Sequence, residues 1–251
     1  MSNRKYKRIL NELKELENSK SLFEKDGIYY HYNDDKIDII YIMIIGPKNT
    51  PYENGFYFFE LEYPDNYPMV PPKMKYNTQG KLPFCKPYKN YPAKHMFNTR
   101  FNPNLYVDGK VCLSMLNTWS GPGWVPTNTI TNILVAIQAL VLNEEPLRNE
   151  PGFENACDKD IYSYNLIIKY ANIKIAILDQ LKSEDLYIFE CFREKMKDLF
   201  IKNIDFITQK IEEFQKIDKD IISSPAYNMV LAIDYLNLIN YFKIIRTKFL
   251  L

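Results

Sequence analysis

The sequence predicts an α+β fold with a helix first, an antiparallel meander sheet next, and further helices after the sheet. Three observations support this prediction. Apolar residues recur at helical spacing near the N-terminus. Three runs rich in β-branched and aromatic residues follow, with only short turns between them. From residue 129 onward, the apolar residues return to a spacing of three and four.

The first helix is expected over residues 4–18, because its apolar and charged residues separate onto two faces. We therefore expect it to lie on the surface, with one side against the core. The buried face would carry Tyr6, Ile9, Leu10, Leu13 and Leu16, and the solvated face Lys5, Arg8, Glu12 and Glu15.

The sheet is predicted from strands at residues 28–32, 39–45 and 56–63. Turn-forming residues separate them: an Asn-Asp-Asp run, a Gly-Pro pair and an Asn-Gly pair. A fourth strand is expected at residues 73–76. Short links between consecutive strands favour antiparallel neighbours, so these strands should form a four-stranded meander.

The segment at 64–103 is rich in Pro, Tyr, Asn and Lys, and apart from the fourth strand it is expected to be mostly loop. An insertion near 77–100 interleaves basic and aromatic residues, a pattern that can stack on single-stranded nucleic acid. We favour a surface flap and do not expect a nucleic-acid partner. Cys85 and His95 also lie there, but without a second ligand pair they do not complete a structural zinc site. The interleaved residues are Lys81, Phe84, Lys86, Tyr88, Lys89, Tyr91, Lys94 and Phe97.

The strongest helical pattern covers residues 129–142, with Thr127 or Thr129 as its cap. Apolar side chains repeat along it at helical spacing, which indicates one buried face. That face would hold Ile130, Ile133, Leu134, Ile137, Leu140 and Val141.

Helical spacing continues over three later segments, and the last begins at a Ser-Pro pair that is typical of a helix start. The segments are 158–182, 184–216 and 225–249. These patterns divide the chain into an α+β domain at 1–154 and an all-helical extension at 155–251. The apolar faces of the extension could be covered by docking on the first domain, by a dimer interface or by a partner helix, and docking is the expectation.

Composition argues against several classes of protein. Lys+Arg total 32 and Asp+Glu 31, and the net charge of +1 gives no global attraction to nucleic acid or an anionic membrane. The N-terminus lacks an apolar signal core, and no membrane-spanning helix is expected. Four widely spaced cysteines without a Cys-x-x-Cys pair favour a reducing, intracellular location, cytoplasmic or nuclear. Two histidines offer few candidates for the base of a Ser or Cys hydrolase.

An asparagine and a cysteine stand eight residues apart in the middle of the chain. The letters FNPN at 101–104 precede GKVCL at 109–113, which places Asn104 eight residues before Cys112. This pattern resembles the ubiquitin-conjugating (E2) enzyme family, whose His-Pro-Asn tripeptide has its asparagine at the same distance from the active cysteine. Asn102 stands in place of that histidine.

Motifs on both sides extend the resemblance to about residues 4–154. Upstream are GPKNTPYENGFY at 46–57 and YPDNYPMVPP at 63–72, and downstream is WVPT at 124–127, in place of the family's Trp-Ser-Pro-Ala. The insertion TWSGPG at 118–123 and the sequence NEPGF at 149–153 are most like the large apollon-type branch of the family.

The resemblance implies a UBC-like fold with Cys112 as the nucleophile of a thioester. The chain would accept ubiquitin or a ubiquitin-like protein from an E1 activating enzyme and transfer it to a lysine of a protein substrate, with or without an E3 ligase. The thiol of Cys112 is then expected to be reachable from solvent. Neither a metal nor another cofactor is implied.

Other residues take roles from the same resemblance. Asn104 is the candidate for stabilising the oxyanion, and one such donor contributes about 2.7–4 kcal/mol. Pro103 and Asn102 would brace its loop. Glu150 is a candidate for assisting the acceptor lysine, because the family often has an acidic residue in a loop beyond the cysteine. From the residues alone, Cys112 could instead be a buried small side chain and Asn104 a turn asparagine.

Two partner surfaces are also implied. Lys5, Arg8 and Lys14 would face the E1, although a solvated helix face gives the same pattern. An exposed apolar patch for an E3 ligase would be formed by Met69, Val70 and Pro126.

Two other functions remain open: a catalytically silent UBC-like adaptor or ubiquitin-binding module, and a structural protein dominated by its helical tail. The presence of Cys112 favours the enzyme.

Overall fold

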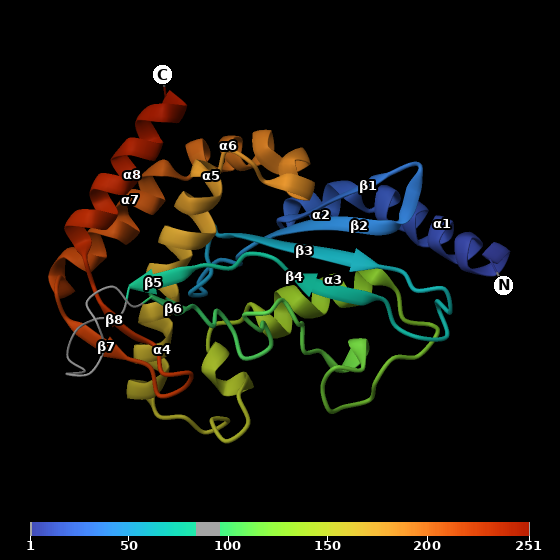
Figure 1. Cartoon of the computed structure of the whole chain (residues 1–251), viewed down its shortest axis with the longest axis horizontal. Coiled ribbons are helices and arrows are strands. Elements are labelled where there is room, and N and C mark those ends of the chain that lie inside the picture. Colours follow the sequence, from blue (N-terminus) through green and yellow to red (C-terminus); the bar gives the residue numbers. More distant parts are fainter. Residues whose placement is uncertain (1, 84–95, 251) are drawn as a thin grey trace.

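The computed structural model describes residues 2–83 and 96–250. Two helices, α1 (Ser2–Asn18) and α2 (Lys20–Lys25), precede a four-stranded antiparallel sheet with strand order β1-β2-β3-β4 (Figure 1). The strands are β1 (Ile28–Asn33), β2 (Lys36–Ile45), β3 (Phe56–Glu62) and β4 (Lys73–Tyr76). The predicted meander, including its fourth strand, is confirmed.

The register of the sheet assigns its side chains to two faces. Ile42 pairs with Phe59, and the next pair is Met43 with Phe58. Because neighbouring residues of a strand point to opposite faces, these two pairs lie on opposite sides. Both faces are buried at the centre of the sheet, since all four residues are at most 2% exposed.

Helix α1 is confirmed, but two residues on each of its predicted faces are placed differently. Lys5 and Glu12 are only 5% and 2% exposed, whereas Tyr6 and Leu10 are 40% and 55% exposed. Lys5 lies 3.5 Å from Asp65 and 3.9 Å from Asp38. Buried charges are stable only with partners, and these partners come from distant parts of the chain.

Glu12 has three donors. Its Oε1 accepts hydrogen bonds from Arg8 Nε at 2.5 Å and from the hydroxyl of Tyr67. Its Oε2 accepts the backbone N–H of Ile130 at 2.9 Å, at the start of α3. Arg8 also donates to the carbonyl of Asn128 at 2.8 Å. One buried carboxylate therefore joins the first helix to two later loops.

Helix α3 (Ile130–Ala136) begins after Thr129, as predicted, and continues as the π-helical segment η2 (Ile137–Val141). The wider π turn changes the direction of the side chains that follow. Leu140 is consequently 62% exposed, and its predicted place on the buried face is wrong. Short 3-10 segments lie on either side of this helix, η1 (Ser114–Leu116) and η3 (Pro146–Asn149).

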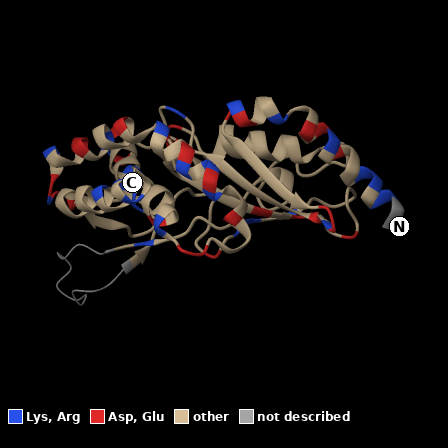
Figure 2. Ribbon diagram, turned by 90° about the horizontal axis from the view of Figure 1, so that it is seen from above, with Lys and Arg blue, Asp and Glu red and all other residues tan. Residues whose placement is uncertain are grey.

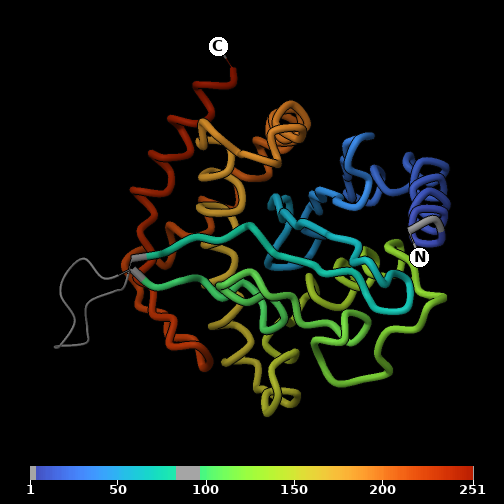
Figure 3. Tube along the Cα trace, turned by 45° about the vertical axis from the view of Figure 1, so that its right-hand side comes forward, coloured from blue at the N-terminus to red at the C-terminus, as the bar shows by residue number. Residues whose placement is uncertain are grey.

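The insertion near 77–100 contains a β-hairpin, so its description as loop is wrong at both ends. Strand β5 (Lys81–Pro83) pairs antiparallel with β6 (Met96–Asn98). Leu82 and Phe97 face each other across this pair and are buried. Figures 1 and 3 show the hairpin beside the C-terminal elements. Cys85, His95 and most of the predicted basic and aromatic stretch lie outside the described residues.

The first C-terminal helix covers 158–182, as predicted. It consists of α4 (Asp158–Ala171), the π-helical η4 (Asn172–Asp179) and α5 (Gln180–Lys182). The second predicted segment is helical but broken into four parts: η5 (Tyr187–Phe192), α6 (Arg193–Lys202), α7 (Ile204–Glu213) and η6 (Phe214–Ile217).

The third C-terminal segment differs from the prediction of an all-helical extension. Strands β7 (Ile221–Ser223) and β8 (Val230–Ala232) form a hairpin, and α8 (Tyr235–Leu250) begins only after it. The Ser-Pro pair therefore lies in the hairpin rather than at a helix start. Tyr227 and Asn228 have φ angles of 64° and 51°, which reverse the chain at this point.

The expected docking of the C-terminal helices is observed. Segment η5 places Phe189 in a stack on Phe58, with ring centroids 4.8 Å apart, and Phe192 lies 6.3 Å from the same ring. These contacts cover the sheet face that carries Met43. On the other side of β3, the hydroxyl of Tyr57 donates to Asn172 at 2.6 Å. None of the described helices is long and apolar enough to cross a membrane.

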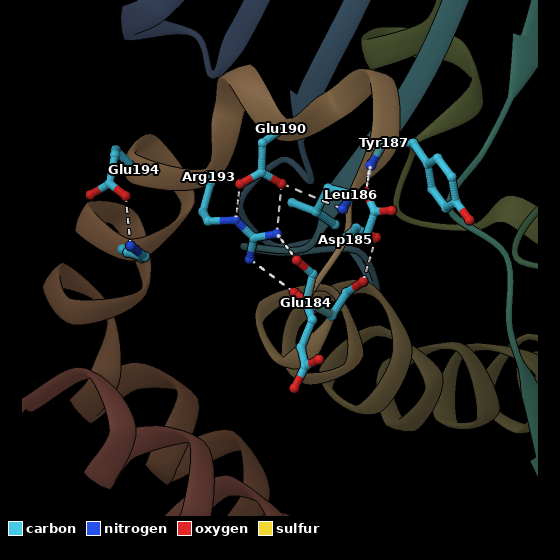
Figure 4. A network of polar contacts seen from close by, with 9 residues as sticks. Glu184, Asp185, Leu186, Tyr187, Glu190, Arg193 and Glu194 are labelled. Atoms are coloured by element: carbon cyan, nitrogen blue, oxygen red, sulfur yellow. Dashed lines mark hydrogen bonds and ion pairs between the residues drawn. The ribbon is translucent and has the colours of Figure 1, made fainter.

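A polar network holds η5 in this position (Figure 4). Arg193 donates to the carboxylate of Glu190 and to the carbonyl oxygens of Ser183 and Glu184. Asp185 accepts the backbone N–H of Tyr187 at 2.7 Å. The network fixes the loop between α5 and η5 and so determines where the aromatic rings of η5 meet the sheet.

Candidate active site

The backbone at 100–104 is held by four hydrogen bonds from large buried side chains. Tyr164 on α4 donates to the carbonyl of Arg100, and Tyr52 donates to the carbonyl of Phe101, both at 2.8 Å. Arg100 itself donates through Nε to the carbonyl of Asn102 at 3.2 Å and through Nη2 to that of Pro103 at 2.7 Å. Three side chains, those of Tyr164, Tyr52 and Arg100, therefore hold the successive carbonyls of this loop.

Asn102 makes the contacts expected of a bracing residue. Its side chain is fully buried and donates to the hydroxyl of Tyr52 at 3.0 Å and to the carbonyl of Val141 at 2.6 Å. Its oxygen accepts the backbone N–H of Asn104 at 2.7 Å. The amide thus satisfies its own polar groups and links the loop to the end of the α3–η2 helix.

Asn104 and Cys112 are joined by two hydrogen bonds. The backbone N–H of Cys112 donates to the carbonyl of Asn104, and the side-chain Nδ2 of Asn104 donates to the carbonyl of Cys112, both at 2.8 Å. The structure therefore brings together the two residues that the sequence separates by eight positions. The second N–H of the Asn104 amide has no acceptor among the described residues.

A residue that the sequence did not suggest fixes the orientation of this amide. Asn149, at the end of η3, donates to Oδ1 of Asn104 at 3.0 Å and to the carbonyl of Leu140 at 3.0 Å. Its own oxygen accepts from Asn143 at 3.1 Å. With its oxygen toward Asn149, the Asn104 amide turns its nitrogen toward Cys112. In the sequence, the only feature that could have pointed to Asn149 is its place in the NEPGF motif.

The expectation that the thiol of Cys112 is accessible is wrong for this conformation, because the residue is 1% exposed. The segment after it folds back closely. Thr118 donates to the carbonyl of Val111 at 2.7 Å and accepts the N–H of Leu113 at 2.9 Å, so it brackets the cysteine. Gly121 approaches Ser114 so closely that a Cβ on the glycine would lie 2.8 Å from the Cβ of the serine.

The other described cysteines differ from Cys112. Cys157 and Cys191 are both exposed. Partial desolvation, together with the charge of Glu190, raises the pKa of the Cys191 thiol to about 11. Cys191 is therefore a poor nucleophile near neutral pH.

Comparison with known proteins agrees with this arrangement. The family model described as ubiquitin-conjugating enzyme matches residues 8–167. The chain belongs to the ubiquitin-conjugating enzyme family. The match contains Cys112, Asn104 and the sheet that supports them.

Three E2 relatives show how far the similarity extends. The chain is 38% identical to "Probable ubiquitin-conjugating enzyme protein 17" of Caenorhabditis elegans, over 85% of this chain and 28% of that protein. It is 34% identical to human "Ubiquitin-conjugating enzyme E2 Z", over 86% of this chain and 57% of the relative. It is also 33% identical to human "Dual E2 ubiquitin-conjugating enzyme/E3 ubiquitin-protein ligase BIRC6", over 81% of this chain and 4% of that protein. The chain thus spans little more than half of E2 Z and much less of the other two.

The candidate acidic residue, Glu150, has a partner of its own. Its carboxylate accepts a hydrogen bond from the hydroxyl of Tyr227 in the C-terminal hairpin. Beside it, Glu144 and Glu145 line a groove of about 590 Å³ that also includes Asn149. Glu145 is paired with Arg148 at 2.5 Å. Because Asn149 lines the groove and also donates to Asn104, a single hydrogen bond connects the groove with Asn104.

The predicted ligase patch is exposed. Met69 is 66% exposed and Val70 39%, and Pro126 is also on the surface. The indole of Trp124 donates to the carbonyl of Pro68 at 2.8 Å, which joins the two loops that carry these residues.

The basic surface of α1 needs a correction. Lys5 is buried in its ion pairs and Arg8 is occupied by Glu12 and Asn128, so of the three predicted residues only Lys14 is exposed. Arg4 and Lys7 are exposed and lie on the same face of the helix as Lys14, since Arg4 is three residues before Lys7 and Lys7 is seven residues before Lys14. Figure 2 shows basic residues along α1 toward the N-terminus.

Proposed function

We propose that this chain is an E2 conjugating enzyme that carries ubiquitin or a ubiquitin-like protein as a thioester on Cys112. The observation that supports it most is the pair of hydrogen bonds between Asn104 and Cys112, on a loop braced by Asn102 and Arg100. A coincidental match of two residues would not require such a connected arrangement.

The reaction has two steps. In the first, the Cys112 thiolate attacks the carbonyl carbon of the modifier's thioester on the E1, and the E1 cysteine leaves as a thiolate. In the second, the neutral amine of a lysine attacks the new thioester. The Cys112 thiolate leaves as the amide bond forms, and the amine releases its proton to solvent or to a base.

Asn104 acts in the second step. Its unused N–H is available for the negative oxygen that develops when the amine attacks the carbonyl. The remaining amide atoms are fixed by Cys112 and Asn149, so the donor is preorganised. The lysine amine becomes easier to deprotonate as it leaves water, because desolvation disfavours its charged form.

Charging requires the thiol to reach the surface. Cys112 is almost fully buried, and Thr118 bridges the residues on either side of it. We infer that the segment at 113–123 opens locally when the E1 binds. Local opening of this kind involves only a few hydrogen bonds and leaves the sheet intact.

Partners would use the exposed surfaces. The E1 would contact Arg4, Lys7 and Lys14 on α1, and an E3 ligase would contact the apolar loops at Met69, Val70 and Pro126. These two surfaces are connected through Glu12, which lies between the helix and both loops.

The burial of Cys112 favours one alternative, a UBC-like adaptor that no longer forms a thioester. The test is incubation of the chain with ubiquitin, an E1 and ATP, followed by electrophoresis with and without reductant. An adduct that disappears with reductant and with Cys112→Ala, but persists in Cys157→Ala, supports the enzyme. Absence of any adduct with several modifiers and their E1 enzymes would favour the adaptor.

A further inference from the structure

The C-terminal hairpin reaches the loop that carries Asn104. Tyr227, at the tip of the hairpin, lies with its ring 5.0 Å from the guanidinium of Arg100. A second ring, that of Tyr106, lies 3.4 Å from the same guanidinium. Arg100 is 8% exposed and forms no ion pair within 4.0 Å among the described residues. Aromatic rings and backbone carbonyls therefore take the place of a carboxylate around this buried cation.

Tyr227 also contacts the other side of the site. Its hydroxyl donates to Glu150, the residue directly after Asn149. Burial, and then the nearby Glu150 carboxylate, raise the pKa of this hydroxyl well above its usual value, so it remains a donor. A single side chain thus links Arg100, which holds the carbonyls before Asn104, with the segment whose Asn149 orients the Asn104 amide.

The backbone of Tyr227 is unfavourable for this residue type. Its φ of 64° lies in the left-handed region, which suits glycine and asparagine but is rare for a large side chain. Asn228, the other turn residue, is of a suitable type. A strained residue persists where its surroundings fix it, which points to a use for the side chain rather than for the turn.

We propose that Tyr227 is a positioning residue for Asn104, through which the β7–β8 hairpin holds the catalytic loop in the geometry needed for transfer to lysine. The proposal deepens the proposed function and rests on it for the transfer step. The structural part, the control of the loop at 100–104 by the hairpin, stands on the contacts of Arg100, Glu150 and Tyr227 alone.

Two variants of Tyr227 separate positioning from folding. Tyr227→Asn removes the ring and the hydroxyl but leaves a residue suited to the turn, so the hairpin should still form and the chain should unfold cooperatively, with a thermal midpoint moderately below that of the wild type. Tyr227→Phe keeps the ring over Arg100 and removes only the bond to Glu150. The matched control is Tyr241→Phe, because Tyr241 also donates to a carboxylate, that of Asp179, within the C-terminal part.

The first measurement is hydrogen exchange of the full chain. We expect the backbone amides of Asn104, Leu105 and Cys112 to exchange about tenfold faster in Tyr227→Asn, with a smaller change in Tyr227→Phe and none in Tyr241→Phe. Unchanged exchange in Tyr227→Asn would overturn the proposal, whether or not the chain proves to be an enzyme.

The second measurement is single-turnover discharge of the charged chain to free lysine at increasing concentration. Tyr227→Asn should lower the maximum rate about tenfold and leave charging and the half-saturating lysine concentration unchanged. Tyr227→Phe should recover part of that rate. Equal rates in the wild type and Tyr227→Asn, or equal losses in Tyr227→Phe and Tyr241→Phe, would overturn it. A wild-type chain that never charges would instead refute the proposed function, and the exchange result would still decide the role of the hairpin.

Discussion

The carboxylate of Glu12, in the first helix, accepts a hydrogen bond from the hydroxyl of Tyr67, in the loop before β4. The same carboxylate also receives the first N–H of α3. Three parts of the chain that are far apart in sequence therefore meet at one buried charge, and the two loops proposed to bind a ligase take their relative position from it.

Replacing this charge should weaken the fold. Glu12→Gln keeps the shape of the side chain but loses the charge that Arg8 and Tyr67 both contact. We expect the free energy of unfolding to fall by about 2–4 kcal/mol, measured by denaturant titration. Glu15→Gln, on the exposed side of the same helix, should change it by less than about 0.5 kcal/mol. Similar losses in both variants would contradict this role for Glu12.

Removing the amide of Asn104 should separate the two steps of the reaction. In Asn104→Ala, charging of Cys112 should persist, while discharge to lysine slows about 100-fold, because one preorganised donor is lost. The comparison is the rate of thioester loss with free lysine after the E1 has been stopped. Asn240→Ala, at an exposed position of α8, provides the control. Equal discharge in Asn104→Ala and the wild type would remove Asn104 from its proposed role.

Asn149 should act only through Asn104. Asn149→Ala removes the donor that fixes the oxygen of the Asn104 amide, and we expect discharge to slow about fivefold to tenfold. In the double variant with Asn104→Ala, the second change should add little, since its target is already gone. The discharge rates of the wild type, the two single variants and the double variant form a double-mutant cycle. If the double variant were slowed by the product of the two single effects, Asn149 would act independently of Asn104.

The burial of Cys112 predicts slow reaction with small reagents. Alkylation by iodoacetamide in the absence of partners, followed by peptide mass spectrometry, should modify Cys112 at least about tenfold more slowly than the exposed Cys157. Thr118→Ala should accelerate modification of Cys112, because it removes the hydroxyl that bridges the residues on either side. Equal rates for the two cysteines of the wild type would mean that the thiol is already open in solution.

The network around η5 should contribute to stability in a pH-dependent way. The hydrogen bonds from Arg193 lower the pKa of Glu190 in the folded chain. A carboxyl whose pKa is lower when folded adds stability above its unfolded pKa, and that stability is lost as the pH falls through the folded value. Glu190→Gln should therefore lower stability at pH 7 by less than about 1 kcal/mol, since the pair is on the surface, and this loss should become smaller as the pH falls toward 3. A variant that lost as much at pH 3 as at pH 7 would contradict this assignment, and Glu194→Gln, whose partner is Lys197, is the control.

The strands and the site pair could be predicted because their signals are local. Dense runs of aromatic and β-branched residues mark β1 to β3, and the eight-residue interval between Asn104 and Cys112 is visible in the chain itself. The burial of Lys5 and Glu12 could not be predicted, because it depends on distant partners: Asp65 is 60 residues from Lys5, and Tyr67 is 55 residues from Glu12. Periodicity alone assigns such charges to solvent.

The C-terminal hairpin and the exposed Leu140 were missed for different reasons. Tyr227 adopts a positive φ that its residue type does not suggest, and the preceding Ser-Pro pair is a common helix start. Leu140 follows helical spacing, but the turn that contains it is a π turn, which a regular repeat cannot reveal.

The contacts of Asn172 restrict which substitutions this chain could have accepted during its evolution. Its side chain donates to the carbonyl of Glu53 at 2.9 Å and accepts from Tyr57, and its oxygen fills the space where Gly55 lacks a Cβ, 1.9 Å from where that atom would be. A larger residue at Gly55 would expel it, and loss of the amide would leave a buried tyrosine hydroxyl without its acceptor. A substitution of Gly55 or of Asn172 alone would disrupt this contact, so Tyr57, Gly55 and Asn172 would have had to be inherited together.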